Sequence, residues 1–286
     1  MRRSLLFIPG NTPGMLQNAT LFSADTLILD LEDAVAVTQK DSARILVSEY
    51  LKANTFPDIE ISIRINGMDT DFYYPDLEAI ISDKVDTIML PKARLNDLVE
   101  LSKILETLEK ARDLTKTIKI IPIIELAISL LEVEEIVRLD RVDGILLGAE
   151  DLTNDMQVPR TEIGNEIAYP RARIAMAAIS YKIDAIDTPY TNTNSEIGLQ
   201  KDSKVALGYG FNAKACIHPN QVPVVNTVFS PSEEAIAEAS KILDAAQVAK
   251  EKNVGVFSYN GKMVDKPIIE RSEKTIARAK KFGLLS

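Results

Sequence analysis

The sequence contains no tryptophan, one histidine and one cysteine among its 286 residues. A single cysteine, Cys216, excludes an intrachain disulfide and is typical of a reducing compartment, so we expect a cytoplasmic protein in which this residue is a small part of the core. One imidazole and one thiol are too few for a zinc site of the usual type. Any metal ion would therefore be held by oxygen ligands.

An excess of positive charge is also lacking. Lysine and arginine number 33 against 42 acidic residues, which gives a net charge of -9 and disfavours nucleic acid as a partner. No apolar run approaches the length of a membrane span, and the first, Leu5–Ile8, is too short for a signal peptide and ends at a Pro-Gly turn. No glycine-rich nucleotide fingerprint is present.

What the sequence does contain is an alternation of short apolar segments with amphipathic ones. Parallel strands that are buried on both faces have this apolar composition. Eight such units are the count of a (β/α)8 TIM barrel, and a doubly wound open sheet is the alternative. The predicted strands are residues 5–8, 26–30, 60–65, 87–92, 120–125, 144–148, 184–187 and 213–219. The predicted helices are residues 13–22, 40–52, 74–82, 95–114, 129–139, 169–181 and 195–208.

A barrel of residues 1–229 leaves residues 230–286 as an extension. The segment Ser230–Glu233 has a capping serine and an early proline, which predict a helix that runs to about Lys252. Asn260-Gly261, between Val254–Tyr259 and residues 262–264, predicts a hairpin, and a last helix is expected at about 268–281. We therefore predict an α/β protein, a barrel with a helix-hairpin-helix extension that acts as a lid or as a subunit contact.

Carboxylates stand where two neighbouring buried strands end. Residues 144–149 stop at Glu150 and Asp151, and residues 120–124 stop at Glu125. The carboxyl ends of barrel strands form the active-site face, so Glu125 and Asp151 are expected to lie close together. Two carboxylates without an imidazole suit Mg²⁺, although each acid could instead cap the following helix or pair with a lysine. The small residues Gly148 and Ala149 are expected to let a substrate approach the backbone at this point.

Other polar residues occupy the same strand ends. The guanidinium of Arg64 matches a carboxylate at two points, so Arg64 either binds an anionic substrate or pairs internally with Glu32 or Asp33. Lys92 allows the same two interpretations. A lone histidine is more often a hydrogen-bonded structural group than a base, so His218 is secondary. Asp30, Glu32 and Asp33 are candidates to hold Arg64 or metal-bound water. The remaining polar residues at strand ends are Asn66 and Asp187.

Motifs along nearly the whole chain resemble those of the citrate lyase β subunit and the malyl-, citramalyl- and citryl-coenzyme A lyases, a family within the HpcH/HpaI aldolase-like superfamily. They are Arg3–Asn11, Leu29–Val35, Arg64–Asn66, Leu90–Lys92, Ile124-Glu125, Gly148–Leu152, Gly210–Lys214 and Asn260–Asp265. The resemblance implies a (β/α)8 barrel, usually in a homotrimer.

The resemblance also implies roles for particular residues. Mg²⁺ would be held by Glu125 and Asp151, with Glu150 as a supporting neighbour, and Arg64 would bind substrate. Asp265 would act as the catalytic acid or base and would reach the site of a neighbouring subunit. The residues thereby predicted to contact substrate are Arg64, Glu125, Lys92 and Asn66.

The implied reaction is the Mg²⁺-dependent cleavage of a citryl thioester into oxaloacetate and an acetyl thioester, with citrate lyase α and γ subunits as further possible partners. Alternatives are a stand-alone malyl- or citramalyl-coenzyme A lyase that yields glyoxylate or pyruvate, a class II pyruvate aldolase, and a non-catalytic barrel in an acyl-carrier complex. Ala213–Gln221 is more similar to the stand-alone lyases and Asn18 to citrate lyase. Coenzyme A and acyl carrier protein therefore both remain candidate carriers.

Overall fold

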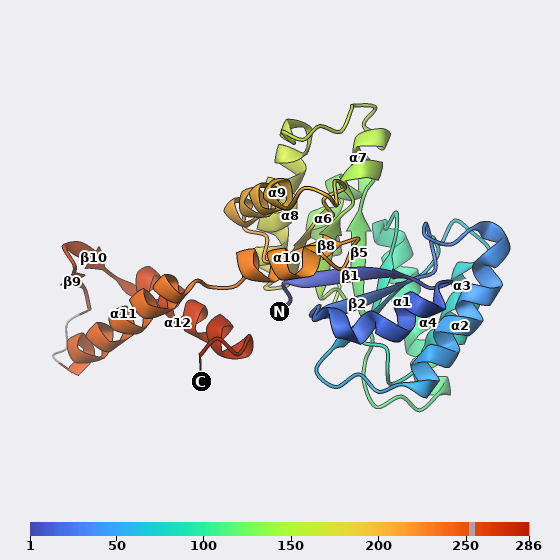
Figure 1. Ribbon diagram of the computed structural model, residues 1–286, viewed down its shortest axis with the longest axis horizontal. Helices are drawn as coiled ribbons and strands as arrows, with labels where there is room; N and C mark the ends of the chain where they lie inside the picture. Colours follow the sequence, from blue (N-terminus) through green and yellow to red (C-terminus); the bar gives the residue numbers. More distant parts are fainter. Residues whose placement is uncertain (252–254, 286) are drawn as a thin grey trace. The chain divides into compact units, whose positions relative to one another are not determined.

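Eight parallel strands close into a barrel in the computed structural model, which describes residues 1–251 and 255–285 (Figure 1). Each strand pairs with the next in the sequence, and the eighth pairs with the first. The predicted (β/α)8 barrel is confirmed, and the doubly wound sheet is wrong. The strands are β1 (Ser4–Pro9), β2 (Thr26–Asp30), β3 (Glu60–Arg64), β4 (Thr87–Leu90), β5 (Lys119–Ile124), β6 (Gly144–Leu147), β7 (Asp184–Asp187) and β8 (Ala213–Cys216).

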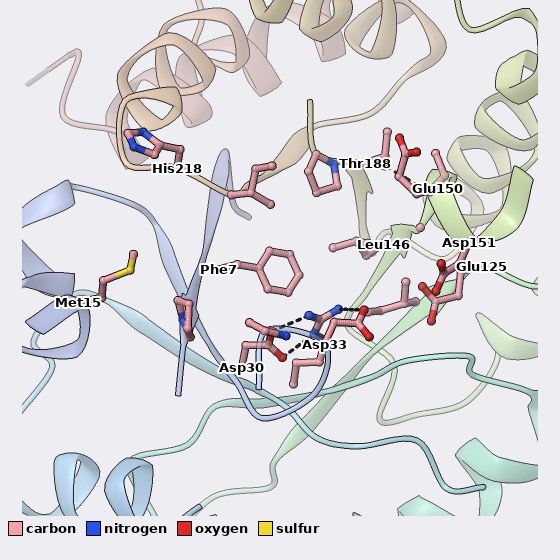
Figure 2. A pocket seen from close by; sticks show the side chains of 18 residues that line it. Phe7, Met15, Asp30, Asp33, Glu125, Leu146, Glu150, Asp151, Thr188 and His218 are labelled. Carbon is pink, nitrogen blue, oxygen red and sulfur yellow. Dashed lines mark hydrogen bonds and ion pairs between the residues drawn. The ribbon is translucent and has the colours of Figure 1, made fainter. Parts of the chain in front are cut away.

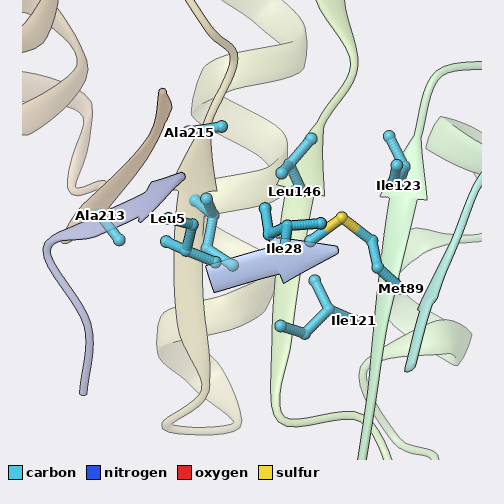
Figure 3. Close-up of a cluster of buried hydrophobic side chains, with 9 residues drawn as sticks. Leu5, Ile28, Met89, Ile121, Ile123, Leu146, Ala213 and Ala215 are labelled. Carbon is cyan, nitrogen blue, oxygen red and sulfur yellow. The ribbon is translucent and has the colours of Figure 1, made fainter. Parts of the chain in front are cut away.

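The inside of the barrel is filled by apolar side chains, most of them branched (Figure 3). Residues two apart on a strand share a face, so Ile121 and Ile123 of β5 both point inward. The small Ala213 and Ala215 of β8 face bulkier groups such as Leu5 and Met89. Because this core is packed, a ligand site can form only at an end of the barrel.

Helices follow the strands and cover the outside of the barrel. In α4, Leu98, Leu101, Leu105 and Leu108 are buried at helical spacing, which is why this segment forms a helix and packs on the sheet. The helices of this part are α1 (Pro13–Asn18), α2 (Lys40–Ala53), α3 (Tyr73–Ile80), α4 (Leu95–Ala111), α5 (Ala127–Leu131), α6 (Val133–Ile136), α7 (Ala149–Asp155), α8 (Ala168–Ser180), α9 (Glu196–Tyr209) and α10 (Gln221–Phe229). Three short 3₁₀ helices are η1 (Ala19–Phe22), η2 (Val37–Gln39) and η3 (Asn165–Ile167).

The helix predicted over residues 129–139 differs from the structure, which has two short helices, α5 and α6, joined at Glu132. The carboxylate of Glu132 accepts a hydrogen bond from the backbone amide of Leu95, 3.0 Å away. This contact anchors the junction to the start of α4. The helices α7 and α10 were not predicted, because neither has the length or the periodicity of the others.

The amino ends of the strands are tied together by Arg2. Its guanidinium forms ion pairs of 2.5 Å with Glu60, 2.7 Å with Asp143 and 2.8 Å with Asp184. These partners precede or begin β3, β6 and β7, so one buried cation links three strands at the end of the barrel that serves stability.

The chain divides into two compact units, residues 1–226 and 227–286. The second contains α11 (Glu233–Glu251), the hairpin of β9 (Phe257–Tyr259) and β10 (Lys262–Val264), and α12 (Lys266–Lys281). Asn260 and Gly261 have φ values of 49° and 75°, as a two-residue hairpin turn requires. The predicted helix-hairpin-helix is confirmed, while the predicted limits Lys252 and Val254 lie outside the described residues. In the described part of the chain, no helix has the length and apolar character needed to cross a membrane.

Candidate active site

A cavity of about 550 Å³ opens at the carboxyl ends of the barrel strands (Figure 2). This volume lies in the range of sites for small molecules, about 300–1,000 Å³. One part of the wall is apolar, with Phe7, Pro9, Met15, Pro189 and Ile217. The charged and other polar residues that line it are Asp30, Asp33, Arg64, Glu125, Glu150, Asp151, Thr188 and His218.

Arg64 both lines the cavity and pairs internally. Its Nε and Nη2 donate to the two carboxylate oxygens of Asp30 at 2.7 and 2.6 Å. Nη1 lies 3.0 Å from Glu32 and 3.4 Å from Asp33. Burial lowers the pKa of Arg64, but the hydrogen bonds and charge of Asp30 outweigh this and raise it. The guanidinium also lies over the ring of Phe7, 4.8 Å from its centre, so its position in the cavity is fixed on several sides.

The carboxyl of Glu32 lies beside Arg64 and close to the negative charges of Asp33 and Asp30. Burial raises the pKa of its carboxyl to about 7, Arg64 opposes the rise, and Asp33 and Asp30 add to it. The Oε2 atom of Glu32 faces Arg64 but makes no hydrogen bond within the described residues. Glu32 therefore shares the guanidinium with two competing carboxylates.

Glu125 and Asp151 lie on the same side of the cavity, as Figure 2 shows. Glu125 is 6% exposed, and the backbone amide of Lys92 donates to its Oε1 at 2.6 Å. Burial raises the pKa of Glu125 to about 8, and the charges of Asp151 and Glu32 contribute. Among the described residues, no lysine or arginine forms an ion pair with either acid, and neither acid caps a helix. The alternatives of a helix cap and a lysine pair thus have no support.

Glycine at position 148 is required by a contact within the protein, and the expected approach of substrate to its backbone stays a prediction. A Cβ atom on Gly148 would lie 2.6 Å from Oε2 and 2.7 Å from Cβ of Glu125. The missing side chain therefore makes the space in which the Glu125 carboxylate lies. Residue 148 precedes α7, whose first turn carries Asp151, so one short segment admits Glu125 and supplies the second acid.

This pair of acids fits a divalent cation. Within the described residues no cluster of three or more histidine, cysteine or acidic side chains could hold a metal ion, so the protein would contribute two carboxylates. Mg²⁺ is commonly held by one or two carboxylates and keeps its other positions for water and substrate. A buried carboxyl that lacks a counter-charge and lies near a second acid is a group that a cation would stabilise.

The other predicted site residues lie in varied surroundings. Asn66 is buried outside the cavity lining, and its amide donates to Asp76 at 2.6 Å and to the carbonyl of Leu31 at 3.0 Å. Lys92 is exposed, has a φ of 48°, and reaches Glu125 through its backbone. Their direct contact with substrate remains a prediction.

Glu150 and His218 do line the cavity. Glu150 lies 3.6 Å from Arg160, and Nδ1 of His218 accepts from the backbone amide of Asn220 at 3.2 Å. Asp265 belongs to the second unit, where it directly precedes α12. Its role as acid or base remains a prediction.

The sequence did not indicate the apolar wall or the support for Thr188. Buried Lys214 of β8 donates to the carbonyl of Thr188 at 2.7 Å and pairs with Asp187 and Asp202. Arg171 of α8 pairs with the same two acids, so Asp187 belongs to a buried network beside the cavity wall. In the sequence, the only indication of this buried network was a lysine, Lys214, within an otherwise apolar strand.

Residues 3–219 match the family described as HpcH/HpaI aldolase/citrate lyase. The chain belongs to this family. It is 39% identical to the citrate lyase subunit beta of Leuconostoc mesenteroides subsp. cremoris, over 98% of this chain and 93% of that protein. It is 31% identical to an L-malyl-CoA/beta-methylmalyl-CoA lyase of Cereibacter sphaeroides, over 97% and 94% of the two proteins.

A solved structure of the CitE protein from Mycobacterium tuberculosis, in complex with magnesium, acetoacetate and coenzyme A, has the same fold. Its TM-score is 0.81 at 30% identity, with 98% of both chains covered. The family, the barrel and the membership among carbon–carbon lyases therefore agree with what the sequence motifs imply.

Proposed function

We propose that this protein is a Mg²⁺-dependent carbon–carbon lyase that cleaves a citryl thioester into oxaloacetate and an acetyl thioester. The observation that carries the proposal is the pair of acids Glu125 and Asp151, which form no ion pair within the described residues and share one cavity with Arg64. The higher identity to a citrate lyase subunit, 39% against 31% for the malyl-CoA lyase, favours the citryl group.

The chain's own residues provide the charge that cleavage needs. Bound Mg²⁺ would act as a Lewis acid on the hydroxyl and carboxylate oxygens of the substrate. Glu125 and Asp151 would orient that ion, and Arg64 would bind the carboxylate and stabilise charge on the developing carbonyl. When the hydroxyl loses its proton to solvent water, its oxygen becomes the new carbonyl and the carbon–carbon bond breaks. The electron pair of that bond moves to the thioester as an enolate. Asp265 is the acid that would protonate the enolate.

The carrier and the assembly are part of the proposal. Coenzyme A, which is bound in the relative from Mycobacterium tuberculosis, is one carrier, and acyl carrier protein is the other. We propose a homotrimer in which residues 230–286 contact a neighbouring subunit, so that Asp265 serves the neighbour's site. Citrate lyase α and γ subunits would be further partners in a cytoplasmic complex, a location that fits the buried, unpaired Cys216.

An activity panel tests this function. Purified protein is given citryl, malyl and citramalyl thioesters of coenzyme A and of acyl carrier protein, with Mg²⁺ or with EDTA, and the released keto acid is measured. We expect oxaloacetate from a citryl thioester, a loss of activity in EDTA, and a loss of at least about 10²-fold in kcat for Glu125→Gln. Glu106→Gln, which changes an acid of α4 that is 56% exposed and lies outside the cavity lining, is the matched control and should keep most of the activity.

Different outcomes reject different parts of the proposal. Glyoxylate or pyruvate as the main product would assign the protein to malyl or citramalyl thioesters. Release of a keto acid from a substrate without a thioester would indicate an aldolase. No cleavage of any substrate, together with no binding of Mg²⁺, would support a non-catalytic barrel.

A further inference from the structure

A buried ammonium group lies behind the acidic loop that holds Arg64. Lys40, the first residue of α2, is 7% exposed and does not line the cavity. Its Nζ donates to the backbone carbonyls of Leu31 and Glu32 at 2.8 and 2.7 Å. Burial of a lysine is costly, and it lowers the pKa of this group, so two specific hydrogen bonds are maintained against a penalty.

The two carbonyls belong to the loop that follows β2, and this loop is fixed to Arg64 at several points. The amide of Leu31 donates to the carbonyl of Arg64 at 2.9 Å, and the amide of Glu32 donates to Asp30 at 2.9 Å. Asp30 in turn forms the two-point contact with the guanidinium. A shift of the loop would therefore move the partners that aim Arg64 into the cavity.

The charges around Lys40 also connect it to the loop that holds Arg64. Four acids act on the ammonium through their charges and favour its protonated form: Glu32, Asp30, Asp76 and Asp33. Its hydrogen bonds nevertheless go to neutral carbonyls. The acids of the loop thus interact with two cations, with Arg64 through ion pairs and with Lys40 through its charge. Without the second cation, three carboxylates would crowd one guanidinium.

We propose that Lys40 is a positioning residue of the reaction: its ammonium clamps the Leu31–Glu32 backbone and so holds Arg64 in the orientation that binds substrate. Lys40 touches no reacting atom and acts through Arg64. This inference rests on the proposed function for its kinetic consequence, but the clamp itself is a structural property that can be measured without turnover.

The kinetic test is a double-mutant cycle of Lys40→Met with Arg64→Ala. If Lys40 acts through Arg64, Lys40→Met lowers kcat/KM by about 10²-fold in the wild-type background, because misorientation on the scale of 1 Å has this effect. In the Arg64→Ala background it lowers kcat/KM by less than about threefold, because the group that it positions is gone. Lys52→Met, on the same helix but 68% exposed, is the matched control and leaves kcat/KM unchanged. Equal losses in the two backgrounds would overturn the proposal in favour of a general role in stability.

The second test is amide hydrogen exchange over residues 29–38 of the metal-free protein. We expect Lys40→Met to accelerate exchange of the Leu31 and Glu32 amides by at least about tenfold, and Lys52→Met to leave it unchanged. If Lys40→Met does not fold, Lys40→Gln retains an N–H donor of shorter reach and is used in its place. Unchanged exchange in the folded variant refutes the clamp. Inactive wild-type protein with accelerated exchange in the variant refutes only the proposed function.

Discussion

Removal of the negative charge of Glu125 is expected to stabilise the metal-free protein at alkaline pH. The carboxyl has a pKa of about 8 in the folded protein against 4.5 for the ordinary group, chiefly because of burial. Between these pH values the folded protein retains a proton that the unfolded chain has lost. Stability therefore falls as the pH rises from about 4.5 to about 8, and above pH 8 the whole penalty is present.

The magnitude follows from the two pKa values. A rise from 4.5 to about 8 corresponds to about 5 kcal/mol of destabilisation once the carboxyl is ionised. In Glu125→Gln the amide oxygen can still accept from the backbone of Lys92, but a buried N–H without a partner costs about 1–3 kcal/mol. We therefore expect the variant to be about 2–4 kcal/mol more stable than wild type at pH 9. At pH 5, where the carboxyl of the wild type is largely uncharged, this gain should be absent.

Urea unfolding in EDTA, followed by far-ultraviolet circular dichroism at both pH values, measures this difference. Glu150→Gln, which replaces a half-exposed acid in the same cavity, should change the free energy of unfolding by less than about 0.5 kcal/mol. Addition of Mg²⁺ at pH 9 should stabilise wild type and leave Glu125→Gln unchanged. A variant that is no more stable than wild type at pH 9 in EDTA would contradict the assignment of Glu125 as a buried carboxylate without a counter-charge.

Two further outcomes test the site. In Mg²⁺ titrations followed by calorimetry, Asp151→Asn should bind Mg²⁺ at least about tenfold more weakly than wild type, because a neutral amide replaces one of two charged ligands. Equal affinity of the two proteins would exclude Asp151 as a ligand. Mixed Asp265→Asn and Arg64→Ala chains, each strongly impaired alone, should recover part of the activity if Asp265 acts in a neighbouring subunit. Either variant alone should show no such recovery. Absence of recovery after subunit exchange would exclude a shared site.

The positions of Glu125 and Asp151 could be predicted from the sequence because they depend on one local rule. An apolar strand that ends in an acid, in a parallel barrel, places that acid on the active-site face. The surroundings of Arg64 could be predicted only as a set of acids. Asp30, Glu32 and Asp33 were all candidates to hold Arg64, and all three lie beside it. The register of β2 and β3, which sets Asp30 directly beside Arg64, decides that Asp30 makes the two-point contact. Such a register is a long-range property that a pattern of residues does not contain.

Two other features were hidden for related reasons. Position 148 requires a glycine because the side chain of Glu125, 23 positions earlier in the sequence, occupies the space that a Cβ atom would need. Only the packing of neighbouring strands reveals this contact. Lys40 begins a helix, where a polar side chain normally faces water, yet its stem lies inside and its ammonium reaches the backbone after β2. Sequence periodicity identifies which face of a helix is apolar but not which polar residue at its start is buried.

The distribution of charge in the cavity explains why a cation should be necessary. Acidic side chains dominate the lining, with Asp30, Asp33, Glu125, Glu150 and Asp151 against one arginine and one histidine. The positive charge of Arg64 is already matched by the acids after β2, so by itself it could not attract an anionic substrate into a cavity of negative potential. In the described part of the chain, Glu125 and Asp151 form no ion pair with a lysine or an arginine. A divalent cation bound there would neutralise these acids and present charge to the substrate. The fold thus separates two tasks: the loop after β2 orients a fixed cation, and the ends of β5 and β6 place two carboxylates whose joint ionisation a bound divalent cation would favour.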